Sequence, residues 1–212
     1  MLRPTSHAEA ARLLNDGGVL LLTTDTLPGF HARVDRPDAV RRIAALKGRP
    51  GAKPLLVLAA SPQAAATVTG DVGQRQWDYA RRCWPGPFSL VLPAASHLAT
   101  EVTGGGATVA VRVPRAAGLV RLLKLAGVPL VSTSANRSGE EPALTLAEAE
   151  TRYGGEVDGV FDPGDGGNAT GPAPRASALI DLGTWPPRVL REGPEPAPAP
   201  GSGDLDRQGG ET

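Results

Sequence analysis

Three clusters of polar side chains follow short apolar runs, at points where strands of an α/β sheet would end. The first, residues 23–29, is rich in threonine, and the third, residues 132–139, holds serine, threonine and asparagine. The second lies between Lys47 and Lys53 and places cations on a proline-broken loop just past a predicted helix. Open α/β sheets commonly build their sites at such strand ends. Since cations and hydroxyl groups both neutralise phosphate charge, the three clusters predict a pocket for an anion or nucleotide.

Each cluster also has a plainer explanation. Threonine and aspartate serve well in a capped turn, which would account for residues 23–29. A cation at a helix C-terminus is electrostatically favourable, which accounts for Lys47 but accounts less well for Arg49 and Lys53. A simple turn, however, needs fewer hydroxyl groups than residues 132–139 carry.

Familiar catalytic signatures are missing from the sequence. None of the three histidines has metal-ligand spacing with a partner, and there is a single cysteine, so no metal site is predicted. No Walker-type phosphate loop occurs, and no Gly-x-Gly-x-x-Gly follows a strand. The formal net charge is zero, with 22 basic and 22 acidic residues, which argues against a protein that coats DNA. Residue types and spacing alone therefore do not name the reaction.

The elements that must position these clusters alternate along the chain. Ser6 and Glu9 have capping-box spacing and predict a first helix to about Asn15. Apolar runs predict strands at 19–23, 54–58, 88–92, 108–113, 129–132, 160–161, 178–181 and 188–190. Further helices are predicted from Pro37, from Ser61, over 116–125 and from Thr145. The alternation predicts an α/β fold with one twisted sheet flanked by helices, and the late strands without intervening helices predict that the sheet is mixed.

The composition divides the chain into two parts. Residues 1–192 are predicted to form one catalytic domain, in which the glycine- and proline-rich stretch 162–176 is a loop. Residues 193–212 are nearly free of apolar side chains and are predicted to be a disordered tail. No apolar run approaches the length that spans a bilayer, and the N-terminus lacks the apolar core of a secretion signal. A cytoplasmic protein without membrane contact is therefore expected.

Six short motifs, in this order, resemble those of the YrdC-type threonylcarbamoyl-AMP synthases. They are Thr-Asp-Thr-x-x-Gly at 24–29, Lys-x-Arg-Pro at 47–50, Lys-Pro-Leu at 53–55, Trp-Pro-Gly-Pro at 84–87, Arg-x-Pro at 112–114 and Ser-x-Asn-x-Ser-Gly at 134–139. The similarity covers residues 5–192. One such motif would be weak evidence, but six in order are specific.

The resemblance implies an open α/β fold and a nucleotidyl transfer. L-Threonine and bicarbonate form a carboxylated amine, which attacks the α-phosphate of ATP and releases pyrophosphate. The product, threonylcarbamoyl-AMP, would serve threonylcarbamoyladenosine modification of tRNA, through partner proteins that use it. Mg²⁺ is implied with the triphosphate and is carried partly by the nucleotide. Positioning and charge stabilisation would dominate such catalysis, so no nucleophilic side chain is required.

The resemblance also implies roles for individual residues. Lys47 and Arg49 match the family's basic pair and are expected to be catalytic, contacting the ATP phosphates and the threonine carboxylate. The residues implied for ATP are Lys47, Arg49, Lys53, Ser132, Ser134, Asn136, Ser177 and Arg191, and those implied for threonine are Thr26, Arg49 and Arg112.

The sequence departs from the family pattern at four places. Thr23 and Pro28 stand where the family usually has proline and tyrosine, Ala178 replaces the threonine of a late Ser-Thr-Val motif, and Leu58 replaces a histidine found in longer relatives. Two alternatives therefore stay open. One is a non-catalytic RNA-binding relative that uses the basic residues between Arg33 and Lys53, and the other is an adenylating enzyme for a different amine.

Overall fold

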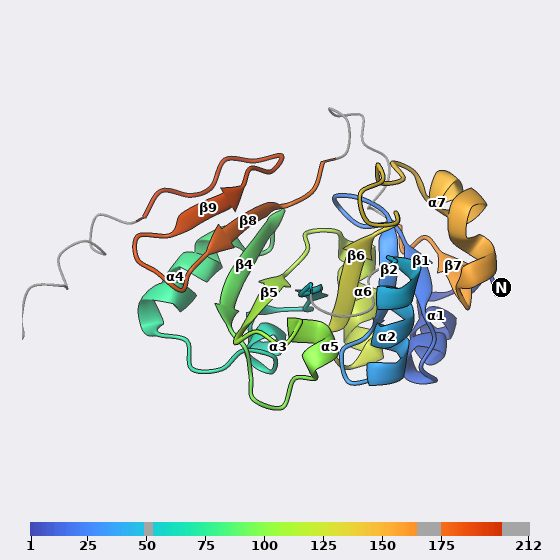
Figure 1. The fold of residues 1–212 in the computed structure, drawn as a ribbon, viewed down its shortest axis with the longest axis horizontal. Coiled ribbons are helices and arrows are strands. Elements are labelled where there is room, and N and C mark those ends of the chain that lie inside the picture. The colour runs from blue at the N-terminus through green and yellow to red at the C-terminus, as the bar shows by residue number, and fades with distance from the viewer. Residues whose placement is uncertain (49–52, 165–174, 201–212) are drawn as a thin grey trace, which may run out of the picture.

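The computed structural model describes residues 1–48, 53–164 and 175–200. Its helices are α1 (His7–Asn15), α2 (Pro37–Leu46), α3 (Pro62–Ala66), α4 (Gln74–Cys83), α5 (Thr100–Thr103), α6 (Ala117–Ala126), α7 (Leu146–Tyr153) and the 3-10 helix η1 (Gly154–Glu156). Its strands are β1 (Leu20–Leu22), β2 (Gly29–Arg33), β3 (Leu56–Leu58), β4 (Phe88–Pro93), β5 (Thr108–Arg112), β6 (Leu130–Ser134), β7 (Gly159–Phe161), β8 (Ala178–Asp181) and β9 (Arg188–Arg191). Figure 1 shows β1, β2, β6 and β7 in one half of the molecule and β4, β5, β8 and β9 in the other.

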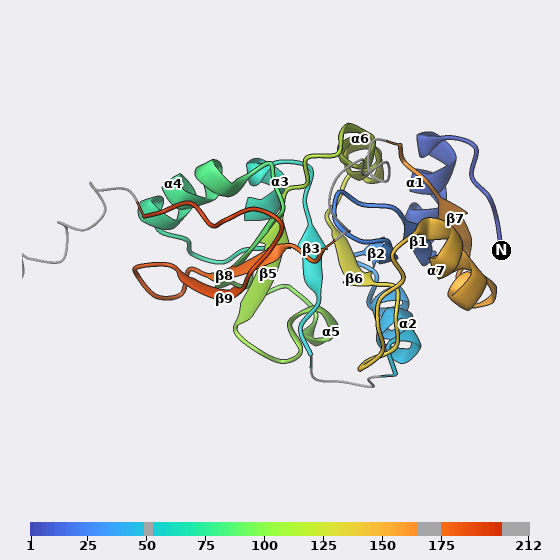
Figure 2. The same ribbon diagram turned by 90° about the horizontal axis from the view of Figure 1, so that it is seen from above.

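The strands of the described residues form a single nine-stranded sheet in the order β7-β1-β2-β6-β3-β5-β4-β8-β9. The pairs β1/β7, β3/β5 and β4/β8 are parallel, and the remaining neighbours are antiparallel. The predicted α/β fold with a twisted mixed sheet and flanking helices is therefore confirmed. In the view from above, α1, α3, α4 and α6 lie toward the top of the picture, and α2 and α5 lie toward the bottom (Figure 2).

The strand β2 was not predicted from the sequence. Its five residues begin with a glycine and include a histidine and an arginine, so they lack the apolar run that marks the other strands. Phe30 and Ala32 nevertheless alternate into the core, and His31 points to the opposite face, fully buried. The pairing of β2 with β6 places this face beside the predicted Ser-x-Asn cluster.

Two apolar clusters hold the layers together. The larger one packs Val40 and Ile43 of α2, and Tyr79 and Ala80 of α4, against one set of strand residues. The smaller one packs α1 and α6 against the side chains that β1, β3 and β6 turn the other way. N-cap bonds begin two of the predicted helices: Ser6 Oγ accepts from the Glu9 backbone N–H at 3.3 Å, and Thr145 Oγ1 accepts from the Glu148 backbone N–H at 3.1 Å.

Gly118 lies where α6 meets the backbone of Pro163, and a Cβ at this position would lie 1.8 Å from the Pro163 carbonyl oxygen. We expect Gly118→Ala to lower the free energy of unfolding by about 1–3 kcal/mol, because the helix and the loop must move apart. The better helix propensity of alanine would offset part of this loss. Urea unfolding measures the change, and Gly155→Ala is the control, since a Cβ there meets nothing within 4 Å. Equal unfolding midpoints for Gly118→Ala and the wild type would contradict this packing.

The first residues after the predicted catalytic domain contact α4 and Arg115, which precedes α6. Tyr79 donates its hydroxyl hydrogen to the Pro198 carbonyl at 2.8 Å, and Glu195 pairs with Arg115 at 2.7 Å. Residues 201–212 of the predicted tail lie outside the described residues.

The helices that the structure describes include none that is both long enough and apolar enough to cross a membrane.

Candidate active site

A cavity of about 1050 Å³ lies between the two halves of the molecule. Its lining comes from α2 and β6 on one side and from β4, β5, β8 and β9 on the other. The sequence-predicted residues that line it are Thr26, Lys47, Lys53, Arg112, Ser132, Ser134, Ser177 and Arg191. Asn136 is bonded to two of these side chains, whereas Arg49 lies outside the described residues. The clusters that are dispersed in the sequence therefore meet at one cavity.

Strand periodicity builds part of the cavity wall. In β5, Thr108, Ala110 and Arg112 line the cavity, and the alternate residues Val109 and Val111 are buried in the core. In the same way, β4 turns one set of side chains to the cavity and the other set to the core. Because side chains alternate across a strand, the same five residues of β5 supply both a buried cation and the packing that holds it.

Lys47 is held by the third cluster. It is the C-cap of α2 and only 4% exposed. Its Nζ donates to the Ser134 carbonyl at 2.8 Å and to Asn136 Oδ1 at 2.6 Å. Asn136 is fixed in turn, since its Nδ2 donates to the carbonyls of Arg137 and Glu140. The ammonium of Lys47 therefore has a fixed place in the cavity wall, which charge stabilisation requires.

Arg112 is a buried cation with one carboxylate partner. It is 1% exposed, and its Nη1 donates to Asp25 Oδ1 at 2.8 Å. The other carboxylate oxygen of Asp25 accepts from the Arg115 backbone N–H at 2.9 Å. Burial lowers the pKa of Arg112, and the charge of Asp25 opposes that shift. The Nε of Arg112 is buried and has no hydrogen-bond partner among the described residues.

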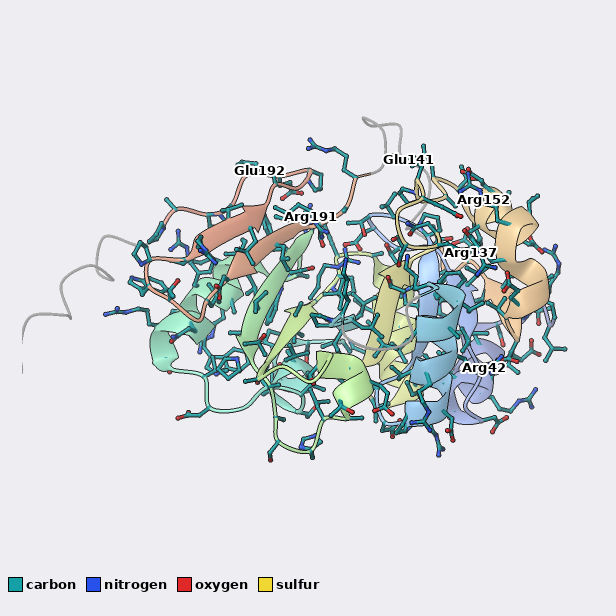
Figure 3. The ribbon with its side chains drawn as sticks, viewed as in Figure 1. Arg42, Arg137, Glu141, Arg152, Arg191 and Glu192 are labelled. Atoms are coloured by element: carbon teal, nitrogen blue, oxygen red, sulfur yellow. The ribbon has the colours of Figure 1, made fainter. Side chains whose placement is uncertain are left out.

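Arg191 brings a second guanidinium to the same cavity from the last strand. Its Nε and Nη2 donate to the Ser177 carbonyl at 3.1 and 2.9 Å. Burial lowers the pKa of Arg191, and the charge of Arg112 lowers it further. Figure 3 shows Arg191 near the middle of the molecule, at the inner end of β9. Because each positive charge disfavours the other, an anion bound between the two arginines would stabilise both in their charged form.

The charge of the described lining is strongly unequal. Five basic side chains and one acidic side chain line the cavity: Arg41, Lys47, Lys53, Arg112, Arg191 and Glu101. Arg41 and Glu101 form an ion pair between α2 and α5, which leaves the rest of the lining cationic. A concave site of one charge sign concentrates ligands of the opposite sign, so this cavity suits an anionic ligand.

The Thr-Asp-Thr cluster forms a turn held by its own side chains, and the same turn lines the cavity. Thr24 Oγ1 donates to the Leu27 carbonyl at 2.8 Å and accepts from the Thr26 backbone N–H at 3.1 Å. Thr24 and Thr26 both line the cavity. Pro28 is buried, and its carbonyl accepts from the Ala135 backbone N–H at 3.1 Å, which ties this turn to the Ser-x-Asn cluster.

Among the polar residues of the site that were not predicted, Asp25, Ser89 and His31 each contact a predicted one. Asp25 lies in the Thr-Asp-Thr motif, so its position was an available signal. Ser89 pairs with Ser177 through their hydroxyl oxygens at 2.8 Å, yet it stands inside an apolar strand pattern. His31 lies beside Ser132, with its Nε2 3.0 Å from Ser132 Oγ, and nothing in its sequence neighbourhood marks it.

The basic residues between Arg33 and Lys53 do not form one surface. Arg33 pairs with Asp35, Arg41 pairs with Asp38 and Glu101, and Arg42 pairs with Asp158. Arg42 lies on α2, in the other half of the molecule from Arg191 (Figure 3). Ion pairing thus accounts for Arg33 and Arg42, whereas Lys47, Lys53 and the ion-paired Arg41 line the cavity.

Comparison with known sequences agrees with this site. The Sua5_yciO_yrdC family model, described as "Telomere recombination", matches residues 12–193. The threonylcarbamoyl-AMP synthase of Pyrococcus abyssi is 32% identical over 184 residues, which are 87% of this chain and 53% of that protein. The threonylcarbamoyl-AMP synthase of Thiobacillus denitrificans is 37% identical over 189 residues, which are 89% of this chain and 94% of that protein. The chain thus spans about half the length of the first relative and nearly all of the second.

Solved structures agree as well. The crystal structure of P. abyssi Sua5 complexed with L-threonine has a TM-score of 0.80 at 32% identity, over 88% of this chain and 54% of that one. E. coli YciO has a TM-score of 0.78 over 90% of both chains, and its 22% identity shows the fold alone. The family match over most of the chain and these relatives together give one conclusion: the chain belongs to the Sua5/YciO/YrdC family.

Proposed function

We propose that this chain is a nucleotidyltransferase that makes threonylcarbamoyl-AMP from L-threonine, bicarbonate and ATP, for threonylcarbamoyladenosine modification of tRNA. The observation that carries the proposal is the cation-lined cavity, into which the family's motifs converge. Relatives named threonylcarbamoyl-AMP synthase at 32% and 37% identity support the same assignment. The cavity volume of about 1050 Å³ lies at the upper end of ordinary ligand sites, as a nucleotide and an amino acid together require.

The reaction balances without a nucleophilic side chain. The amine of threonine and bicarbonate give a carbamate and water. A carbamate oxygen then bonds to the α-phosphorus of ATP, and the bond from that phosphorus to the bridging oxygen breaks, so that pyrophosphate leaves. The chain's part is to hold two anions together and to stabilise the charge that develops, which is how phosphoryl and nucleotidyl transfers are generally catalysed.

The buried cations suit this task. Lys47 is fixed by Ser134 and Asn136, and we assign it to the ATP phosphates. We assign Arg191 and Lys53 to the nucleotide, and Arg112 to the carboxylate of threonine together with Thr26. The roles of Ser132, Ser134, Asn136 and Ser177 at the nucleotide, and that of Arg49 at both substrates, remain predictions from the motifs.

Mg²⁺ is proposed as part of the ATP substrate. Among the described residues no three His, Cys, Asp or Glu side chains lie together as a metal site. The one carboxylate of the described lining, Glu101, is ion-paired with Arg41, so the wall offers no set of carboxylate ligands of the kind that Mg²⁺ prefers. The residues present thus fit an ion that is held by triphosphate oxygens and water, and the cations of the wall would bind the remaining phosphate charge.

Neither alternative is favoured by a separate observation. The arginines proposed for an RNA-binding relative are ion-paired on α2 and β2. A different amine substrate would need a changed threonine side of the cavity, where Pro28 is the departure from the family. Tests with other amino acids address that alternative directly. A cytoplasmic location and partner proteins that consume the product remain predictions.

The proposed function predicts that pyrophosphate release from MgATP requires both L-threonine and bicarbonate. We expect omission of either one to reduce release to the background rate, because no carbamate then forms to attack the α-phosphorus. A coupled pyrophosphate assay measures the rate, and serine, valine and glycine in place of threonine are the matched controls. Pyrophosphate release that ignores threonine, or that is faster with another amino acid, would contradict the substrate assignment. Salt-sensitive RNA binding without ATP turnover would favour the RNA-binding relative.

A further inference from the structure

His31 is a fully buried imidazole directly behind the cavity wall. It lies in β2 opposite Ser132 of β6, so that both side chains are on the same face of the sheet. Its Nδ1 is 2.9 Å from the Gly29 carbonyl oxygen, and its Nε2 is 3.0 Å from Ser132 Oγ. Ser132 lines the cavity, whereas His31 does not. His31 therefore cannot contact a ligand in the cavity itself, and its hydrogen bond with Ser132 is its link to the cavity.

The two contacts fix the direction of the hydrogen bond between His31 and Ser132. A carbonyl oxygen only accepts, so the contact with Gly29 requires a hydrogen on Nδ1. Burial lowers the pKa of His31 to about 3, and the neighbouring Arg112 also lowers it, so the imidazole is neutral at ordinary pH. A neutral imidazole with a hydrogen on Nδ1 has none on Nε2. Ser132 must then donate its only hydroxyl hydrogen to His31.

Two other hydroxyls of the lining, those of Thr26 and Ser134, also donate their only hydrogen to a protein group. Thr24 donates to the Leu27 carbonyl, so the 3.0 Å contact between the hydroxyls of Thr24 and Thr26 needs the hydrogen of Thr26. Ser134 donates its hydrogen to Asn136 Oδ1 at 2.6 Å. These hydroxyls each direct a hydrogen into the protein. What these two hydroxyls have left for a ligand are lone pairs, whereas the lysines and arginines of the lining can only donate.

We propose that His31 is a positioning residue that makes Ser132 a hydrogen-bond acceptor toward the cavity. The ligand group that fits Ser132 is an N–H or O–H donor, such as the amino or hydroxyl group of an amino acid or a hydroxyl of ribose. A fully ionised phosphate, which only accepts, does not fit this atom. The proposal rests on the proposed function and refines it: Ser132 accepts from a donor group of a substrate, and the cations of the lining bind the phosphates.

A double-mutant cycle between His31 and Ser132 tests the proposal. His31→Met removes the acceptor, so that the Ser132 hydroxyl can rotate. L-Threonine and ATP are titrated separately by calorimetry into the wild type, His31→Met, Ser132→Ala and the double variant. We expect each single variant to weaken one of the two ligands about tenfold, the loss of one hydrogen bond, and the double variant to be no weaker than Ser132→Ala. His97→Met, at an exposed histidine, is the matched control and should bind as the wild type does.

The outcomes separate positioning from a purely structural role. Weakened threonine identifies an amino-acid group as the donor, and weakened ATP identifies a nucleotide hydroxyl or amine. If His31→Met lowers the affinity by the same factor in the wild type and in the Ser132→Ala variant, the proposal is overturned. The effect of His31 would then not pass through Ser132. If the wild type binds neither ligand, the proposed function fails, and the next measurement still decides the role of His31.

That measurement needs no variant. Nitrogen-15 NMR of the imidazole in the wild-type chain reports which ring nitrogen carries the hydrogen. We expect His31 to show a protonated Nδ1 and an unprotonated Nε2 from pH 8 down to pH 5. A hydrogen on Nε2 would overturn the proposal, since Ser132 would then accept from His31 and keep its own hydrogen for the cavity.

Discussion

Replacing Lys47 with alanine is expected to lower the rate of threonine-dependent pyrophosphate release by about 10²–10³-fold or more, the typical effect of removing one preorganised charge-stabilising donor. Lys47 is 4% exposed and is held by the Ser134 carbonyl and Asn136 Oδ1. A cation fixed in this way needs no rearrangement when charge develops on the phosphates. Its removal should therefore affect kcat more than the KM for threonine.

Two controls separate this loss from a general effect of removing a lysine. Lys124→Ala removes an exposed lysine from the last turn of α6, away from the cavity lining, and should leave the rate unchanged. Lys47→Met keeps most of the side-chain volume without the charge, so it should be as inactive as Lys47→Ala if charge is what matters. Thermal unfolding of each variant shows whether the fold is intact. A folded Lys47→Ala protein with a rate within threefold of the wild type would contradict the assignment of Lys47.

The sequence predicts the kinds of side chain in this site better than it predicts their pairings. Lys47 and the Ser-x-Asn cluster could be identified because each stands at the end of a regular element with a clear pattern. The ion pair of Arg112 with Asp25 joins residues 87 positions apart, and the contact of Ser132 with His31 joins residues 101 apart. Neither follows from a local pattern, because both depend on how distant strands pair.

Two elements show why local patterns also fail. The strand β2 carries His31 and Arg33 on the face opposite Phe30, so polar and apolar residues alternate in its sequence and no apolar run marks it. It is nevertheless paired on both sides, with β1 and β6. The helix α4 is dominated by polar residues and was not predicted, yet Tyr79 and Cys83 are buried on one of its faces. In both cases tertiary packing decides the structure over the weak local signal.

Composition could not show which polar groups of the cavity are hydrogen-bond donors toward a ligand and which are acceptors. Counting hydroxyl groups and cations together predicts an anion site. The hydrogen-bond directions divide that set: the hydroxyls of Ser134 and Thr26 donate their hydrogens into the protein, whereas the cations of the lining carry donor groups only. A site with separate donor and acceptor surfaces suits substrates that carry both anionic groups and N–H or O–H groups, as threonine and ATP do.

The second large effect is expected at Asp25, where the Asp25→Asn variant should lose about 3–5 kcal/mol of unfolding free energy, the typical cost of leaving a buried charge without its partner. Arg112 is 1% exposed, and the Asp25 side chain is 14% exposed. The neutral amide would not compensate the guanidinium. It would also replace one of the two carboxylate oxygens, which now accept from Arg112 and from the Arg115 backbone N–H, with a donor.

The companion variant Arg112→Met distinguishes an unpaired charge from a loss of packing. Asp25 would keep its bond to the Arg115 N–H and some exposure to water, so Arg112→Met should cost less stability than Asp25→Asn. The double variant Asp25→Asn/Arg112→Met should then be more stable than Asp25→Asn alone, which additive effects cannot give. Urea unfolding followed by tryptophan fluorescence measures all three, with Asp38→Asn at an exposed ion pair as the control that should change little. If Asp25→Asn unfolds at the wild-type urea concentration, Asp25 does not balance the buried charge of Arg112.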